Sequence, residues 1–209
     1  MARPRSEQAH RSALDATVDV LLDAGVEGVT IEEVANRSGV AKSTLYRHFG
    51  SKESLIANAA RCCVIEHPTP DTGNLADDLD FLFGRYHASD EAERFPDLLP
   101  MLIDAGTRDA AMHEVLLEVL EERSRPMRTV LQLAQLRGEI SRDLDLDTAI
   151  AMIVGPLSHR RLVERKEVTP EFKRTIVTGA IAALRATAGD DAGASDEPAP
   201  TSVAGAGTR

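Results

Sequence analysis

The sequence predicts an all-α protein, and three features carry that prediction. Aromatic side chains make up only 3% of the 209 residues and tryptophan is absent, so a core has to be built from the aliphatic residues that helices favour. Apolar residues recur three and four positions apart along much of the chain, which is the period of an amphipathic helix. A composition of 43% hydrophobic and 28% charged residues is that of a chain able to bury a core. A wholly disordered chain is therefore excluded, and an all-β sandwich or barrel is disfavoured.

The first helix is predicted by apolar residues on one face. These fall at i, i+4, i+7 and i+8, and a glycine suited to end the helix follows them: Leu14, Val18, Leu21, Leu22 and then Gly25.

A short second helix is predicted after Thr30. Thr30 precedes the run Ile31–Ala35, and Glu33 stands three residues after it, which is the pattern of a capping box. The run Ser38–Val40 interrupts this helix after about two turns. We therefore expect a tight turn centred on Gly39.

A third short helix, Lys42–Phe49, follows the turn and breaks at Gly50. Ser51 then offers a simple N-cap to a fourth helix, because Ser54 rather than Glu or Gln stands three residues later.

A turn-rich segment, residues 67–73, separates these helices from a longer helical body. Its two prolines bias the preceding residues away from helical geometry. Five helical patterns follow: Asn74–Ala88, Glu91–Ala105, Asp109–Leu136, Asp145 or Asp147 through Glu164, and Pro170–Ala188. Pro126 and Pro156 lie inside two of these patterns and are expected to kink them. We expect domains at 7–67 and 68–188 and a disordered tail at 189–209, which is poor in apolar bulk.

The charge balance is acidic overall but close to neutral at the N-terminus. The formal net charge is −10, whereas residues 1–66 hold eight Lys or Arg against nine Asp or Glu. A protein that coats nucleic acid or an anionic membrane through bulk charge is therefore excluded. Contact with DNA has to be confined to a small basic surface.

The compartment signals indicate the cytoplasm. Cys62 and Cys63 are the only cysteines, and adjacent cysteines rarely reach disulfide geometry without strain. No apolar run approaches the ~18 residues of a membrane span, and the N-terminus lacks a signal-peptide core. A disulfide-stapled secreted domain is excluded, and we expect no membrane partner.

The strongest functional signal is the segment Thr30–Leu55. A helix of about two turns, a glycine turn and a second short helix form a helix-turn-helix, whose second helix lies in the major groove of DNA. The DNA-contact candidates are hydroxyls and cations suited to phosphates and base edges: Lys42, Ser43, Thr44, Tyr46, Arg47, His48 and Lys52. Leu45 and Phe49 are four residues apart and are expected to face inward. On spacing alone, the alternative is an ordinary helical hairpin with a solvated charged face.

The same segment carries a dense residue pattern, which is Thr30-Ile31-x-x-Val34-Ala35-x-x-Ser38-Gly39-Val40-x-x-x-Thr44-Leu45-Tyr46-x-His48-Phe49-x-Ser51-Lys52-Glu53-x-Leu55. This pattern resembles the DNA-binding domain of TetR-type repressors over about Glu7–His67. The resemblance implies a three-helix DNA-binding head followed by a helical ligand-binding and dimerisation body. It also implies roles for single residues: a helix cap near a phosphate for Thr30, the start of the recognition helix for Lys42, Ser43 and Thr44, DNA-backbone contacts for Tyr46 and His48, and a phosphate clamp for Lys52.

The resemblance extends more loosely into the body, which is similar to one C-terminal subtype of these regulators. The residues that carry this similarity are Gly138-Glu139-Ile140, Asp145 and Ile153–Leu157, together with Arg160, Arg161 and Leu162. It implies that the last two helices form a four-helix bundle between two subunits. The residues expected at this dimer interface are Leu157, Phe172, Ile176, Gly179, Ala180, Ala183 and Leu184. On periodicity alone, an intramolecular packing stripe is the alternative.

Candidate effector contacts are polar or aromatic residues set among the apolar faces of the body helices. They are Tyr86, His87, His113, Gln132, Gln135 and His159. For each of them the alternative is a surface residue or a satisfied core group. The acidic charge of the body favours cationic or neutral effectors over anions.

Enzyme signatures fail when they are tested position by position. Val40–Thr44 imitates the end of a phosphate-binding loop, but Asn36 and Ala41 occupy the positions where glycine is required. No pair of nucleophile and base stands out either. We therefore expect neither enzymatic activity nor a cofactor.

Metal signatures are equally weak. Asp143–Asp147 begins like a calcium loop, yet Thr148 replaces the turn glycine, so helix capping is the better interpretation. Cys62, Cys63 and His67 are suited to a soft metal or to sensing thiol-reactive compounds, and buried core thiols are the favoured alternative. We expect no bound metal.

The function predicted from these patterns is a DNA-binding transcriptional regulator of the repressor kind. A homodimer would read a palindromic operator with two heads ~34 Å apart, and a small effector would release it by shifting the population of head spacings. The alternative is a helical small-molecule-binding or interaction protein whose DNA-binding head is inactive.

Overall fold

The computed structural model of the chain describes residues 3–63, 68–88 and 94–193, and side chains within 7–63, 68–83 and 94–186. Inside these ranges the chain forms helices and no strand, which confirms the all-α prediction. The elements are α1 (Arg3–Gly28), α2 (Ile31–Ser38), α3 (Lys42–Phe49), α4 (Lys52–Cys62), α5 (Leu75–Ala88), α6 (Phe95–Arg108), α7 (Ala110–Arg137), α8 (Leu146–Ser158), the π-helical turn η1 (His159–Val163) and α9 (Pro170–Gly193). None of these described helices is both long and apolar enough to cross a membrane.

The helix ends near the N-terminus follow the predicted local signals. Gly25 has a φ of 69°, which interrupts α1 where its end is predicted. The Thr30 hydroxyl accepts a hydrogen bond from the Glu33 N–H at 3.1 Å and caps α2. The Glu33 carboxylate turns instead to the Arg37 Nε at 2.7 Å, so the capping box is only half formed. Gly39, with a φ of 70°, then ends α2 in the left-handed conformation.

The third helix has the predicted bounds, and the fourth, α4 (Lys52–Cys62), begins after the predicted cap. α3 covers Lys42–Phe49 and ends at Gly50, whose φ is 75°. Ser51 caps α4 by accepting a hydrogen bond from the Ser54 N–H at 3.1 Å, and this is the simple cap that the sequence indicates.

The five helices of the body lie close to where the patterns place them, with differences at the ends of three of them. α6 covers Phe95–Arg108 instead of the predicted Glu91–Ala105. Asp145 caps α8 by accepting from the Thr148 N–H at 2.8 Å, as the capping interpretation predicts. α8 ends at Ser158 and continues as η1 instead of running on to Glu164. α9 runs to Gly193, five residues past the predicted end and into the predicted tail. Residues 194–209 of that tail lie outside the described residues.

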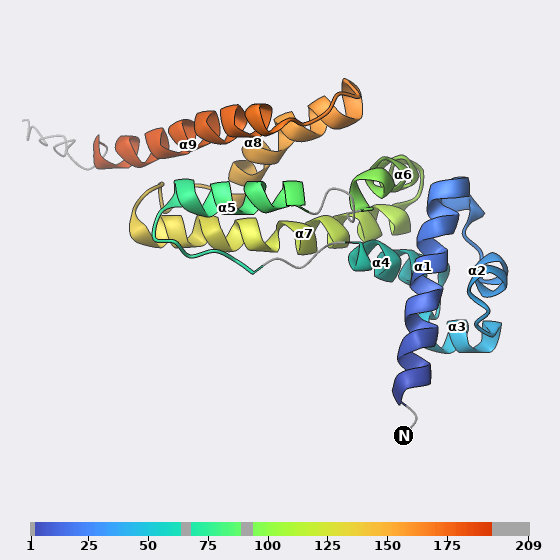
Figure 1. Cartoon of the computed structure of the whole chain (residues 1–209). Coiled ribbons are helices and arrows are strands. Elements are labelled where there is room, and N and C mark those ends of the chain that lie inside the picture. Colours follow the sequence, from blue (N-terminus) through green and yellow to red (C-terminus); the bar gives the residue numbers. More distant parts are fainter. Residues whose placement is uncertain (1–2, 64–67, 89–93, 194–209) are drawn as a thin grey trace, which may run out of the picture.

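Two apolar cores divide the molecule, and α7 belongs to both. The first core joins α1–α4 with α6 and the first half of α7, from Met112 to Val119. The second joins α5, α8 and α9 with the second half of α7, from Met127 to Ala134. In Figure 1, α1–α4 stand at one end, α6 lies beside them, and α7 extends from there along the rest of the body. α7 therefore connects the two cores covalently.

Candidate DNA-binding surface and ligand cavity

α3 is anchored by two apolar side chains on one face. Leu45 is fully buried and Phe49 is 6% exposed, and both pack into the first core as predicted. Because the helix has only eight residues, this anchorage fixes its rotation and leaves the opposite face in solvent.

The predicted DNA-contact residues gather on and around that open face. Six of them are exposed: Thr30, Lys42, Ser43, Tyr46, Arg47 and His48. Thr44 and Lys52 are half-buried. Tyr46 leaves 54% of its surface to solvent, which is a high value for a large aromatic side chain. The side chains that the sequence singles out are therefore available to a partner.

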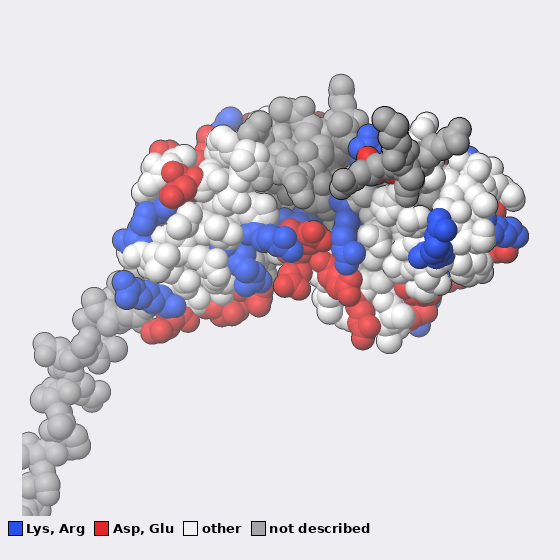
Figure 2. All heavy atoms as spheres, turned by 90° about the horizontal axis from the view of Figure 1, so that it is seen from below, with Lys and Arg blue, Asp and Glu red and all other residues white. Residues whose placement is uncertain are grey.

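The electrostatics of this face depend on a few separate cations. Figure 2 views the molecule from the side on which α3 lies, where single Lys and Arg side chains stand apart on a largely uncharged surface of the head. The Lys42 Nζ lies 2.9 Å from the Glu32 Oε1, and the pKa of Glu32 is lowered by this hydrogen bond. Arg47 and Lys52 form no ion pair with any described residue, so their charges are uncompensated.

α1 supports the end of α3 through His10, a residue that the sequence analysis missed. The His10 ring stacks on the Phe49 ring with centroids 5.0 Å apart. The His48 ring stands edge-on to the His10 ring, with centroids 6.1 Å apart. His10 is exposed but lies one helical turn before the buried Leu14, and this i, i+4 spacing is the signal that places its ring on the side of α1 next to Phe49.

A second support holds α2 in place through Arg37. Its guanidinium lies 2.5 Å from the Asp23 carboxylate on α1 and 2.7 Å from Glu33. Hydrogen bonds to Asp23 first and Glu33 second raise the pKa of Arg37. The guanidinium therefore joins α1 to α2 and is already occupied when DNA arrives.

A large cavity of about 1710 Å³ lies between the head and the body helices. It extends from His10 and Cys62 at the head to Lys173 in α9. Its apolar lining includes Leu82, Phe83, Phe95, Leu99, Leu117, Leu120, Met127, Ile150, Val154, Leu157 and Leu162. The volume exceeds the ~300–1,000 Å³ of common ligand sites, so a sizeable organic molecule fits.

Four of the six predicted effector contacts lie outside the described lining of this cavity. His113 and Gln132 are exposed and lie outside it. Gln135 donates to the backbone carbonyls of Ser141 and Leu144 at 3.1 and 2.9 Å, so its amide holds the turn before α8.

His159 is exposed in η1, with its Nε2 3.8 Å from the Glu164 Oε1, and it too lies outside the cavity. The side chains of Tyr86 and His87 lie outside the described part of the chain. The physical reason for the correction is that a polar residue within an amphipathic helix usually marks its solvent side.

The predicted dimer residues divide into two groups. Ala180 and Leu184 are buried in the second core of the same chain, so for these two the intramolecular alternative is correct. Leu157 packs partly against that core, and Ile176 is half-buried. Phe172 is half-buried with the Arg160 guanidinium 4.3 Å from its ring centroid.

The second group, Gly179 and Ala183, is exposed on α9. A Cβ added at Gly179 or at Gly155 of α8 would meet no heavy atom within 4 Å. Met152, also on α8, leaves 41% of its surface open. α8 and α9 therefore share small and apolar residues that nothing in the described chain covers.

Both cysteines are free thiols at the end of α4, with Cys62 exposed and Cys63 half-buried, so the favoured interpretation of buried core thiols is wrong. Burial first, and the nearby Asp15 carboxylate second, raise the pKa of Cys62, which makes its thiol less nucleophilic. No group of three potential metal ligands occurs among the described residues, and His67 lies outside them.

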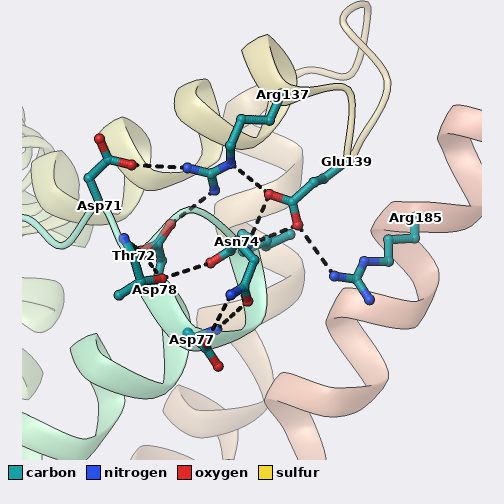
Figure 3. A network of polar contacts seen from close by, with 9 residues as sticks. Asp71, Thr72, Asn74, Asp77, Asp78, Arg137, Glu139 and Arg185 are labelled. Atoms are coloured by element: carbon teal, nitrogen blue, oxygen red, sulfur yellow. Dashed lines mark hydrogen bonds and ion pairs between the residues drawn. The ribbon is translucent and has the colours of Figure 1, made fainter.

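A polar network ties the far end of the body together (Figure 3). The Arg137 guanidinium contacts Asp78 at 2.9 Å, Glu139 at 2.7 Å and Asp71 at 3.2 Å. The Glu139 carboxylate also accepts from the Leu75 N–H at 2.9 Å, at the start of α5. The network therefore joins the segment before α5 to the C-terminal end of α7.

Comparisons with known proteins agree with this architecture. The model of the family described as "Bacterial regulatory proteins, tetR family" matches residues 13–59. The model of the family described as "Tetracyclin repressor-like, C-terminal domain" matches residues 69–180. A curated relative is the uncharacterized HTH-type transcriptional regulator YdeS of Bacillus subtilis, 29% identical over 191 residues that cover 88% of this chain and 94% of the relative.

Two further matches cover a short segment and the whole fold, respectively. The negative transcriptional regulator IcaR of the biofilm operon in Staphylococcus aureus is 30% identical over 50 residues, which is 24% of this chain and 27% of IcaR. The crystal structure of a TetR-family transcriptional regulator from Rhodococcus sp. superposes with a TM-score of 0.68 at 23% identity, covering 86% of this chain and 99% of that one.

Proposed function

This chain belongs to the TetR family of bacterial transcriptional regulators, and from that premise we propose that it is a repressor: a homodimer that binds a palindromic operator and is released by a small effector. The observation that carries the proposal is the open face of α3, where Tyr46 and Arg47 stand exposed while Leu45 anchors the helix from behind. A helix held in this way can enter the major groove as a rigid unit. The name of IcaR as a negative regulator supports repression.

In the proposed complex, the residues around α3 divide between positioning and reading. Ser43 at the start of the helix and Arg47 one turn later are suited to base edges. The hydroxyl of Tyr46 and the ring of His48 contact the sugar-phosphate backbone of the DNA, and Lys52 binds a phosphate. Thr30, Lys42 and Thr44 add contacts on either side of the same groove.

The exposed face of α8 and α9 supports the homodimer. Small residues let two helices approach closely, and the exposed Gly179 and Ala183 of α9 offer that approach, while Met152 of α8 adds exposed apolar surface. A two-fold axis through this face would give each subunit the same contacts. It would also place two heads at the spacing of successive major grooves, ~34 Å.

The cavity supports control by an effector. His10 on α1 and Cys62 on α4 contribute to its wall, and so do α7 and α8 of the body. A molecule bound there contacts the head and the body together. It would favour one head orientation over another in proportion to its differential affinity, and this is the requirement for release from the operator.

The proposed division of the chain follows from these roles. We assign DNA binding to residues 7–67 and effector binding and dimerisation to 68–188. We place the protein in the cytoplasm and assign it no catalytic step.

Selection of binding sites from random duplexes with the purified full chain tests the proposal. The enriched duplex is expected to be a palindrome with half-sites about one helical turn apart. Tyr46→Ala and Lys52→Ala should each weaken operator binding about tenfold in fluorescence anisotropy, because each removes a backbone contact from both heads. Leu136→Ala is the matched control, since this side chain is 73% exposed on α7 and belongs to the body.

Two results would contradict the proposal. If a folded, dimeric protein enriches no duplex, the chain is a helical ligand-binding protein with an inactive head. If the palindrome is enriched but both substitutions leave its affinity unchanged, the DNA-contact residues are wrongly assigned.

A further inference from the structure

The ligand cavity has a charge balance opposite to that of the whole chain. Its described lining holds seven Lys or Arg against four Asp or Glu. The full chain holds 24 Lys or Arg against 34 Asp or Glu. Cationic side chains are therefore concentrated where a ligand would lie.

Two of the four lining acids are already paired to lining cations. Glu122 lies 3.1 Å from the Arg61 guanidinium, and Asp147 is paired with Arg128. In each pair the carboxylate and the guanidinium neutralise one another at the cavity wall. They leave less of the lining carboxylate charge available to a cationic ligand.

Two lining guanidinium groups have no such partner. Arg125 on α7 and Arg161 on η1 both line the cavity, are exposed to solvent, and form no ion pair and no side-chain hydrogen bond with any described residue. Arginine presents a planar fork of donors that matches a carboxylate or phosphate group. An anionic group entering the cavity would find these donors unoccupied.

The rest of the wall is apolar. Leu117 on α7 lines this cavity and leaves 52% of its surface exposed. Leu99 and Leu120 beside it belong to the same lining. A ligand with a hydrocarbon body would remove this surface from water.

We propose that the effector is an amphipathic anion, with an apolar body against the leucine-lined wall and a carboxylate or phosphate at Arg125 and Arg161. This inference rests on the proposed function in one respect, namely that the cavity is the effector site. It reverses the expectation of cationic or neutral effectors, because net charge sums over the whole surface whereas a bound ligand responds to the charges lining its own cavity.

The test is a binding experiment on the full chain without DNA. Dodecanoate is the probe, and dodecanol and dodecyltrimethylammonium are matched compounds with the same chain and a neutral or cationic head. Isothermal calorimetry below micellar concentrations is expected to show saturable dodecanoate binding, about tenfold or more tighter than for the other two compounds.

Substitutions then locate the anionic group. Arg125→Gln and Arg161→Gln should each weaken dodecanoate binding about tenfold and leave dodecanol binding unchanged. Arg142→Gln is the control for charge alone, because Arg142 is exposed outside the cavity. The double variant Arg125→Gln/Arg161→Gln is measured in the same way. Melting curves of the unmodified chain and of the four variants establish that the variants are folded.

Three outcomes overturn the assignment: no dodecanoate binding, equal or tighter binding of the cationic or neutral compound, or full binding by the double variant. Operator binding is measured separately by anisotropy. A chain that binds dodecanoate through both arginines but enriches no duplex keeps the ligand assignment and refutes the proposed function. A chain that binds its operator but not dodecanoate keeps the proposed function and refutes the ligand assignment.

Discussion

Arg137 at the end of α7 donates a hydrogen bond to the fully buried carboxylate of Asp78 in α5 over 2.9 Å. A buried carboxylate has lost its hydration, and this pair together with the Thr72 hydroxyl at 2.8 Å replaces it. Arg185 of α9 reaches Glu139 of the same network at 3.3 Å. The network therefore fixes α5, α7 and α9 relative to one another at the end of the body away from the head.

Replacing Arg137 should strongly destabilise the body. Arg137→Ala leaves Asp78 buried without its cation and is expected to lower the free energy of unfolding by about 3 kcal/mol. Urea denaturation of the full chain measures the change. Arg142→Ala, which removes an exposed arginine five residues later, should change it by less than about 0.5 kcal/mol. Equal effects of the two substitutions would show that the network does not stabilise the fold.

The same network predicts how stability depends on pH. Burial alone would raise the pKa of Asp78, but hydrogen bonds from Thr72 and Arg137 outweigh it and lower that pKa. For Glu139, burial is likewise outweighed by hydrogen bonds from the Leu75 N–H and Arg137, which lower its pKa. Both carboxylates thus have lower pKa values in the folded chain than in the unfolded chain.

Their contribution to stability is fully present above the ordinary carboxylate pKa of about 4 and is lost as pH falls through the lower folded values. The melting temperature should therefore fall steeply in that acidic range. The fall should be shallower in Arg137→Gln, because this variant has less carboxylate pairing for acid to remove. A parallel decline in both proteins would contradict this account.

Glu32 is expected to restrain operator binding, because its carboxylate holds the Lys42 ammonium at 2.9 Å in the free protein. Glu32→Gln removes this competitor for the cation and should tighten operator binding up to about fivefold, the range of an exposed ion pair. Lys42→Gln should weaken binding and reduce the slope of the salt dependence by about 0.9 for each phosphate that Lys42 neutralises. Anisotropy across a salt series distinguishes the two variants, and an unchanged slope in Lys42→Gln would show that Lys42 does not bind a phosphate.

The head could be predicted from sequence because its determinants are local. Thr30 and Ser51 cap helices through their own side chains, and Gly39 supplies a positive φ where the turn needs one. The exposed face of α3 follows from Leu45 and Phe49, four residues apart and both buried. Each of these signals lies within a few residues of the feature that it predicts.

The cavity and the division of the α9 face could not be predicted in the same way. Which side chains line a cavity depends on how four or more helices pack, and the sequence around His113 and Gln132 does not reveal their neighbours in space. Ala180 and Gly179 are adjacent in one small-residue stripe, yet one is buried in its own chain and the other is exposed. Periodicity identifies the stripe but not the partner that covers each part of it.

His10 should prove important for both stability and DNA binding. His10→Ala removes the ring that stacks on Phe49 at 5.0 Å and is expected to cost about 1 kcal/mol of stability. Operator affinity should fall as well, because the end of α3 loses its support from α1. His10→Phe keeps a stacked ring and should retain most of both properties. If His10→Ala binds the operator like the unmodified chain, α3 does not depend on this contact.

The dimer can be tested at Gly179 without disturbing the chain's own packing. A Cβ at this position meets no heavy atom within 4 Å, so the single chain of Gly179→Leu should fold normally. Leucine is also a better helix former than glycine. In a dimer whose α9 helices meet at a two-fold axis, the leucines of both subunits would meet at the same contact and force the two helices apart. Light scattering coupled to size-exclusion chromatography is expected to show a dimer for the unmodified chain and a monomer for this variant.

The control for Gly179→Leu is Ala111→Leu, which adds an exposed leucine at the start of α7 and should leave the dimer intact. The monomeric variant should also bind a palindromic duplex far more weakly, because each head then binds without the other. A Gly179→Leu protein that is folded and still dimeric would place the subunit interface elsewhere. An unmodified chain that is monomeric at every concentration would remove the homodimer from the proposed mechanism.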